Sequence, residues 1–209
     1  MEHPAITPKC RWLARDVGVI PDFLSPAECA AHIAASEAVG YGEAPVTTAR
    51  GMIMIKELRN NDRVMADDPA TADRLYGRLA SALPPRVNKK WRPCGLNERL
   101  RFYRYDPGQQ FDWHHDGCYA RPTGECSFFT FMIYLNDGFE GGATIFAELD
   151  DRVRDDDRLT VTPRQGMALI FAHPLLHKGE PVVSGRKYVL RTDVMYARQS
   201  SDRASAAGP

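Results

Sequence analysis

One short segment of the chain carries side chains that can bind a metal ion. Tyr105 to Gly117 reads YDPGQQFDWHHDG and contains His114 and Asp116. On a strand, residues two positions apart point to the same side, so one imidazole nitrogen and one carboxylate oxygen can meet a single ion. Two ligands hold a metal weakly. We therefore predict a third ligand, His177, which follows the apolar segment GMALIFA.

Two histidines and one carboxylate on one face of an octahedral ion leave coordination positions open, as the chemistry of O₂ at Fe(II) requires. A basic pair, Arg186-Lys187, follows His177 after a turn. One end of 2-oxoglutarate can chelate such an ion, and the far carboxylate then needs a buried cation. An HxD pair alone is a weak signal. Combined with the distant HxGxPV segment and this cation, it is a specific signal for a site that binds Fe(II) and 2-oxoglutarate.

These motifs resemble those of the prolyl 4-hydroxylase type of 2-oxoglutarate/Fe(II)-dependent oxygenases. The resemblance spans roughly Leu100 to Tyr196 and rests on four pieces: YDPGQQFDWHHD, MIYLND, EGGATIF and HKGEPVVSGRKYVLRTDV. It implies a double-stranded β-helix (a jelly roll), Fe(II) as the metal, 2-oxoglutarate and O₂ as cosubstrates, and ascorbate as a reductant.

The family pattern also implies a role for individual residues. It assigns the metal to His114, Asp116 and His177. It places 2-oxoglutarate against Lys187, Tyr105 and Tyr134, and Arg191, four residues after Lys187, is expected on the same strand face as a further cosubstrate contact. Arg186 is an alternative partner for the cosubstrate. Since neighbouring strand residues point to opposite faces, only one of Arg186 and Lys187 can face inward, and we choose Lys187.

The resemblance further implies the kind of reaction. Related halogenases have a small residue in place of the carboxylate ligand, so Asp116 favours hydroxylation of an unactivated C–H bond. The implied substrate is a prolyl residue in a peptide or protein, and the alternative is a free amino acid or small metabolite. We expect the rim residues Arg59, Asn60 and Trp113 to contact the substrate, because functional groups favour loops and their surroundings.

Two other classes of function remain open at this point. The three ligands could bind zinc for hydrolysis, but Lys187 and the tyrosines would then have no purpose and no general base is evident. A metal-binding jelly roll without catalysis would have no need of the intact ligand set and cation. His173, four residues before His177, is a further but less favoured ligand because Pro174 interrupts the segment.

The flanking sequence predicts the elements that must position this site. Helices are expected from a capping box at Ser25 to Val39, and from Asp68-Pro69 to Leu83, which precedes a double proline. Alternating or aromatic stretches predict strands at residues 51–58, 100–105, 127–135, 159–162, 167–171 and 187–196. We thus predict one domain, residues 1–198, with helical support to about residue 95 and a jelly-roll core from about residue 96.

Length and composition limit the remaining possibilities. The 209 residues suit a single domain, and 44% apolar residues with 26% charged residues are typical of a globular protein. The formal net charge is zero, so nucleic acid is not an expected partner. No apolar run is long enough to span a bilayer, and the N-terminus does not resemble a secretory signal. Five scattered cysteines suggest reduced thiols. We therefore expect a cytoplasmic protein without membrane contact. We also expect a charged surface loop at residues 150–158 and a disordered tail at residues 199–209. The oligomeric state is left open.

Overall fold

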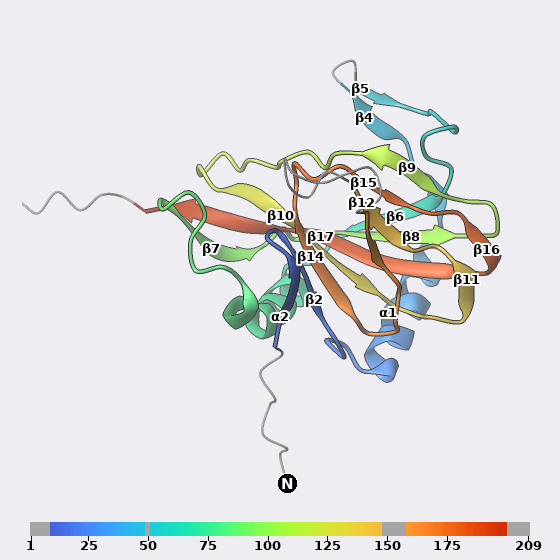
Figure 1. Cartoon of the computed structure of the whole chain (residues 1–209), viewed down its shortest axis with the longest axis horizontal. Helices are drawn as coiled ribbons and strands as arrows, with labels where there is room; N and C mark the ends of the chain where they lie inside the picture. Colours follow the sequence, from blue (N-terminus) through green and yellow to red (C-terminus); the bar gives the residue numbers. More distant parts are fainter. Residues whose placement is uncertain (1–8, 49–50, 148–157, 200–209) are drawn as a thin grey trace, which may run out of the picture.

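Two β layers face each other, and two helices cover the outer side of the larger layer (Figure 1). The computed structural model describes residues 9–48, 51–147 and 158–199. All paired strands in this part of the chain are antiparallel. The predicted mainly β, jelly-roll architecture is confirmed. The predicted surface loop, except for Arg158, and the predicted tail, except for Gln199, lie outside the described residues.

The larger layer is a nine-stranded sheet. Its order is β1-β2-β14-β10-β17-β8-β6-β3, and β7 also pairs with β17. The strands are β1 (Arg11–Ala14), β2 (Val17–Ile20), β3 (Gly42–Glu43), β6 (Asp62–Asp67), β7 (Trp91–Leu96), β8 (Arg99–Tyr105), β10 (Cys126–Tyr134), β14 (Ala168–Ala172) and β17 (Lys187–Arg198).

The smaller layer carries most of the metal-binding candidates. Its four strands run in the order β13-β12-β15-β9. Their bounds are β9 (Phe111–His114), β12 (Thr144–Phe146), β13 (Leu159–Val161) and β15 (His177–Gly179). Two further pairs are β11 (Phe139–Gly141) with β16 (Val182–Gly185), and β4 (Val46–Thr48) with β5 (Gly51–Ile53).

Both predicted helices are present with their predicted starts. Helix α1 (Pro26–Val39) begins with the capping box, in which Ser25 Oγ accepts from Glu28 N and Glu28 Oε2 accepts from Ser25 N. Helix α2 (Pro69–Leu79) begins at Asp68, whose side chain accepts from Thr71 N, and a short 3-10 turn (Ala80–Ala82) follows it. No helix in the described ranges is long and apolar enough to cross a membrane.

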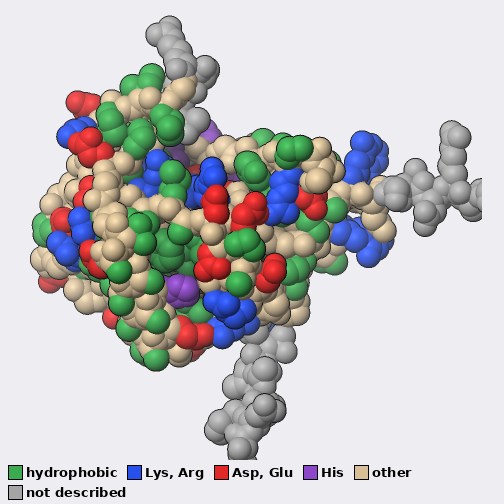
Figure 2. All heavy atoms as spheres, turned by 180° about the vertical axis from the view of Figure 1, so that it is seen from behind, with side chains coloured by type: hydrophobic (Ala, Val, Ile, Leu, Met, Phe, Trp, Pro, Cys, Tyr) green, Lys and Arg blue, Asp and Glu red, His purple; other side chains and the backbone are tan. Residues whose placement is uncertain are grey.

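Strand alternation divides the buried side chains into two cores. Alternate residues of the larger sheet, such as Phe102 and Leu190, pack toward the helices with Leu75 and Leu79. The intervening residues pack between the two β layers, in a cluster that includes Tyr103, Tyr105, Tyr134, Phe146, Phe171 and Val189. The second cluster surrounds the candidate site, so the fold places the site between the layers. On the surface, acidic and basic side chains are interspersed (Figure 2), in keeping with the zero net charge.

Two features of the first half differ from the prediction. The strand predicted at residues 51–58 is β5 alone, because the backbone turns at Ile55, whose carbonyl accepts from Leu58 N and Arg59 N. The second feature is that β1, β2 and β6 join the larger sheet, which was not expected. The division near residue 95 stays a prediction, and the larger sheet takes strands from both sides of it.

Gly166 offers a test of this packing. Its φ is +76°, and a Cβ built there would lie 2.1 Å from the carbonyl oxygen of Leu24. We expect Gly166→Ala to lower the free energy of unfolding by about 1–3 kcal/mol, since both the backbone conformation and the contact are unfavourable for alanine. Chemical denaturation measures this, with Gly95→Ala as the control because a Cβ there meets open space. Equal destabilisation by both changes would contradict the expectation.

Candidate active site

The three predicted metal ligands lie together where β9 and β15 pair. His114 and His177 are directly opposite each other in this pair. Asp116 follows the end of β9, and its backbone N–H donates to the carbonyl of His173. The three side chains offer ligand atoms that lie within 4.8 Å of one another. The strand argument that placed Asp116 on the same strand face as His114 was therefore wrong in detail, because the chain leaves β9 at His114 and turns the carboxylate back toward it.

Backbone carbonyls fix the tautomer of both histidines. His114 Nδ1 lies 2.7 Å from the carbonyl oxygen of Asp112, and His177 Nδ1 lies 2.9 Å from that of Leu175. A carbonyl can only accept, so each Nδ1 carries the proton and each Nε2 presents its lone pair. Those Nε2 atoms lie 3.8 and 3.7 Å from the carboxylate oxygens of Asp116. Two free nitrogen lone pairs and a carboxylate converging in this way fit a divalent metal ion.

The charge states of the ligands suit the same role. Burial and the neighbouring His177 lower the pKa of His114 to about 3. Burial also lowers the pKa of His177. Both imidazoles are therefore neutral at pH 7, as metal ligation requires. Aromatic rings enclose them: the Phe111 ring stacks on His114 with centroids 3.5 Å apart, and Phe171 packs edge-on against His177.

Asp116 is held in an ionised, oriented state. Thr130 Oγ1 donates to its Oδ2 at 2.5 Å, and Arg191 Nη2 lies 2.9 Å from its Oδ1. Burial alone would raise the pKa of Asp116, but the Arg191 guanidinium and the hydrogen bond from Thr130 act in the opposite direction, and the pKa lies below its usual range. The carboxylate can thus serve as an anionic ligand with a fixed orientation.

Thr130 gives a prediction about metal affinity. Thr130→Val keeps the shape of the side chain but removes the hydroxyl that orients Asp116. We expect the Fe(II) dissociation constant to rise about 10-fold, at the lower end of the effect of losing an outer-shell partner. Anaerobic Fe(II) titration measures it. Thr160→Val, an exposed β13 position, is the control, and an unchanged Fe(II) affinity in Thr130→Val would refute the role.

A buried lysine lies next to the ligands. Lys187 is 3% exposed, and its Nζ donates to the carbonyl of Gly142 at 2.6 Å. The same Nζ lies 5.0 and 5.5 Å from the ring centroids of Tyr105 and Tyr134. No carboxylate forms an ion pair with it within the described ranges, and burial lowers its pKa to about 7. A cation buried without a counter-ion is suited to receive a ligand carboxylate.

Three of the four residues expected to contact 2-oxoglutarate line a cavity at the candidate site, and the fourth does not. Tyr105, Lys187 and Arg191 line one cavity together with all three metal-binding candidates. Tyr134 is fully buried behind this cavity, and its hydroxyl bonds Thr144 Oγ1, which does line it. Arg186 instead lies outside and pairs with Asp106. Of the adjacent cations, Lys187 therefore faces the site.

The three residues expected to contact the substrate also differ in whether they line a cavity. Arg59 is buried and lines a second, larger cavity that adjoins the metal-binding candidates. Asn60 does not line it, and its side chain accepts from the backbone N–H of Gln110. Trp113 lines neither of these cavities and packs against the cations Lys178 and Arg158. The geometry therefore places only Arg59 where a substrate could touch it.

Several residues at the site were missed by reasoning from the sequence. Thr130 and Thr144 occupy strands whose aromatic content drew attention to packing instead. The larger cavity is lined by Arg63, Arg101 and Tyr103 as well as Arg59. Arg101 and Tyr103 alternate on β8, a period-two signal that could have placed both on the inner face. His173 is buried near Asp193 and is not part of the ligand cluster found in the described residues.

Comparison with known proteins agrees with this geometry. Residues 100–192 match the model of the 2OG-Fe(II) oxygenase superfamily. A provisionally named prolyl 4-hydroxylase of Acanthamoeba polyphaga mimivirus is 34% identical over 116 residues, and the match covers 46% of this chain and 44% of that protein. The matched region thus spans less than half the length of this curated relative.

Two solved structures share the fold. One is a viral collagen prolyl hydroxylase from Paramecium Bursaria Chlorella virus-1 in complex with 2OG, with a TM-score of 0.59 and 23% identity, covering 88% of this chain and 97% of that one. The other is a prolyl hydroxylase from Trichoplax adhaerens in complex with a hypoxia inducible factor peptide, with a TM-score of 0.62 and 15% identity, covering 86% and 83%. At these identities the likeness establishes the fold alone.

Proposed function

We propose that the chain carries a 2OG-Fe(II) oxygenase domain of the prolyl 4-hydroxylase type and hydroxylates an unactivated C–H bond, with a prolyl residue of a peptide or protein as the substrate. 2-Oxoglutarate, O₂ and the substrate C–H give succinate, CO₂ and the alcohol, with one oxygen atom entering each organic product. One observation carries the proposal: the His114, Asp116 and His177 cluster shares a cavity with the unpaired Lys187.

The metal would be held by His114, Asp116 and His177. When bound, Fe(II) supplies the activation of O₂ and the oxidising power, which the protein itself lacks. The backbone carbonyls of Asp112 and Leu175 keep both Nε2 lone pairs aimed at the ion. Thr130 and Arg191 hold the Asp116 carboxylate in a fixed orientation, in which it could serve as the third ligand.

The far carboxylate of 2-oxoglutarate would pair with Lys187. Its ammonium is directed into the cavity by Gly142 and flanked by the Tyr105 ring. Tyr105 is buried, and its hydroxyl is available as a donor to the same carboxylate. The apolar walls, including Met132, Phe171 and Val189, exclude water from the cosubstrate. This strengthens the ion pair, because the local dielectric constant is low.

The prolyl substrate is supported by the relatives. The curated relatives that match residues of this chain carry prolyl 4-hydroxylase names, and one structural neighbour is described as holding a peptide. We also propose a cytoplasmic location and ascorbate as the reductant that maintains Fe(II), on the basis of the resemblance and the scattered cysteines.

A product assay tests the proposal. The protein with Fe(II), 2-oxoglutarate and air is incubated with proline-containing peptides, free amino acids and small carboxylic acids, and each is analysed by mass spectrometry. We expect a gain of one oxygen atom in a prolyl compound, matched by an equal amount of succinate. Succinate that forms while only non-prolyl compounds gain oxygen would retain the oxygenase class and overturn the prolyl substrate.

A further inference from the structure

The larger cavity beside the metal ligands has a wall rich in arginine. Its volume is about 370 Å³, and it shares His114, Asp116, Phe111 and Tyr103 with the cosubstrate cavity. Four guanidinium groups line it: Arg59, Arg63, Arg101 and Arg191. The proposed metal chemistry accounts for only one of them, Arg191, which orients Asp116.

Arg59 is the most constrained of the four. It is 4% exposed, and its guanidinium carbon lies 4.6 and 4.5 Å from the ring centroids of Tyr103 and Phe111. Its Nε donates to Asn61 Oδ1, whereas its Nη2 is buried and finds no hydrogen-bond partner within the described ranges. A buried guanidinium donor left unpaired is unfavourable. The two rings hold Arg59 in place at the cavity, and its Nη2 has no partner among the described residues.

Arg63 also lacks a counter-ion. It is half-buried in β6, on the strand that follows the turn containing Arg59. It forms no salt bridge with any carboxylate in the described ranges. Burial lowers its pKa, and the nearby charges of Arg59, Arg101 and Arg191 lower it further, although Tyr103 acts in the opposite direction. Like charges are therefore gathered at this cavity, which all four arginines line.

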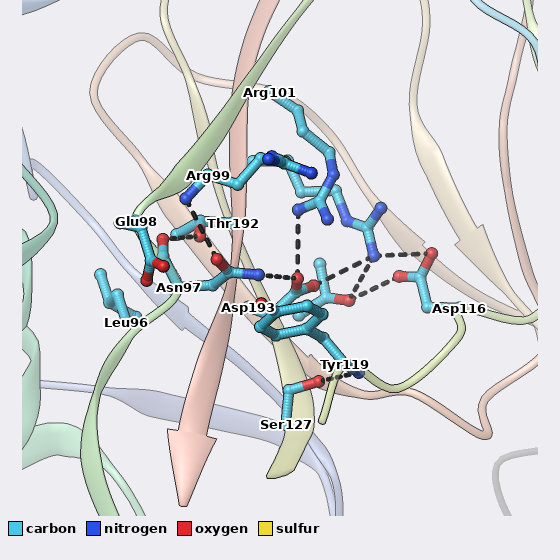
Figure 3. A network of polar contacts seen from close by, with 12 residues as sticks. Leu96, Asn97, Glu98, Arg99, Arg101, Asp116, Tyr119, Ser127, Thr192 and Asp193 are labelled. Atoms are coloured by element: carbon cyan, nitrogen blue, oxygen red, sulfur yellow. Dashed lines mark hydrogen bonds and ion pairs between the residues drawn. The ribbon is translucent and has the colours of Figure 1, made fainter. Parts of the chain in front are cut away.

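The carboxylates at the cavity are already engaged. Asp193 binds Arg101 at 3.1 Å and Arg191 at 3.4 Å, and Asn97 also donates to it (Figure 3). Asp116 is paired with Arg191. Four guanidinium groups thus face two carboxylates, and the bound metal would add positive charge. Among the described residues, no carboxylate forms an ion pair with Arg59 or Arg63.

Another part of the cavity wall is apolar. Residues at and near the β4–β5 hairpin contribute to it: Pro45, Val46, Ile55 and Leu58. A cavity with a cationic wall, an apolar wall and access to the metal ligands fits a small organic acid or the end of a chain better than an uncharged internal peptide segment.

We propose that the substrate carries a carboxylate, which Arg59 and Arg63 bind while its apolar body lies against the β4–β5 side of the cavity. Guanidinium groups match the two oxygens of a carboxylate, and the pair is strong where water is excluded. A free amino acid, an N-acylated amino acid and a C-terminal prolyl residue all offer this group. The inference rests on the proposed hydroxylation at this site, and it adds a free carboxylate as a feature that the substrate must carry.

The test compares acids with their amides. N-acetyl-L-proline and N-acetyl-L-proline amide differ only in the charge at issue, and an acetylated peptide ending in proline is paired with its C-terminal amide in the same way. Calorimetry measures the binding of each to the protein with Fe(II) and 2-oxoglutarate under anaerobic conditions. We expect at least one acid to bind about 10-fold or more tightly than its amide. The pair that discriminates shows whether a small acid or a chain end is bound.

Variants assign the effect to the arginines. In Arg63→Gln and Arg59→Gln the preference for the acid is expected to fall to about 3-fold or less, whereas Arg92→Gln, an exposed β7 position outside the cavity, keeps it. Using both variants guards against misfolding of the more buried one.

Equal binding of acid and amide by the wild type, or no binding of any probe, overturns the inference. Succinate formation without added substrate tests the proposed oxygenase function separately. If succinate forms but acid and amide bind equally, the carboxylate inference fails alone. If no succinate forms, the proposed function fails.

Discussion

Replacing His114 with alanine is expected to lower Fe(II)-dependent succinate formation by more than about 100-fold, beyond the usual effect of losing an outer-shell partner of a metal. The reason is that the two remaining ligands, Asp116 and His177, would hold Fe(II) only weakly. The same variant should lose Fe(II) in equilibrium dialysis, which separates metal loss from a defect in chemistry.

The control for this variant is His32→Ala. His32 lies on α1 and packs near Phe102, on the helix side of the larger sheet and away from the ligand cluster. We expect it to retain Fe(II) and most of the turnover. Unchanged Fe(II) binding and turnover in His114→Ala would show that the metal, if one is needed, is held elsewhere.

Replacing Lys187 with alanine is expected to raise the KM for 2-oxoglutarate by about 30-fold or more, equivalent to about 2 kcal/mol or more, as found when one partner of a buried charge pair is removed. Turnover should recover in part at high 2-oxoglutarate, because the metal ligands are intact. Arg186→Ala is the matched control. Arg186 is the neighbouring cation and pairs with Asp106 on the outside, so its KM should change by less than about 3-fold. The reverse order of the two effects would assign the cosubstrate to Arg186.

The pH dependence of cosubstrate binding follows from the same residue. Burial lowers the pKa of the unliganded Lys187 to about 7, and the carboxylate of 2-oxoglutarate requires the charged form. The affinity for 2-oxoglutarate should therefore fall as pH rises above 7, by up to about tenfold per pH unit. The free energy of unfolding of the unliganded protein should change in the opposite direction. Between pH 7 and 10.5 the unfolded state holds more protons at Lys187 than the folded state does, so the contribution of this group to stability increases as pH rises. Lys187→Arg, which stays charged, should lose the dependence of affinity on pH, and an unchanged profile in this variant would contradict the assignment.

The parts of the fold that the sequence predicts well are those with a strong local signal. The capping box at Ser25 and the aspartate at Asp68 mark the helix starts, because each satisfies backbone N–H groups within one turn. Strands β8, β10 and β17 are long, apolar or alternating. By contrast, β1 and β2 have four residues each, and their membership of the sheet depends on pairing with β14, more than a hundred residues away. Local sequence carries little information about such pairing.

The candidate site shows the same division. The motif predicted that His114, Asp116 and His177 lie together, which the structure shows. Strand alternation allowed only one of Arg186 and Lys187 to face inward, and the resemblance favoured Lys187, which lines the cavity. The arginines of the larger cavity could not be grouped in advance. Arg59 and Arg63 come from the turn and strand before α2, whereas Arg101 and Arg191 lie on β8 and β17. Only the order β17-β8-β6 in the larger sheet brings them to one wall.

The oxygenase assignment is tested by measuring the conversion of 2-oxoglutarate to succinate by the wild-type protein. The protein is prepared without oxygen, loaded with Fe(II) or Zn(II), and then exposed to air. The arrangement of the ligands and Lys187 predicts succinate only when Fe(II), 2-oxoglutarate and O₂ are all present, with none formed when Zn(II) replaces Fe(II). No Fe(II)-dependent succinate, together with tight Zn(II) binding and no affinity for 2-oxoglutarate, would contradict the oxygenase assignment and favour a zinc-dependent hydrolase or a metal-binding domain without catalysis.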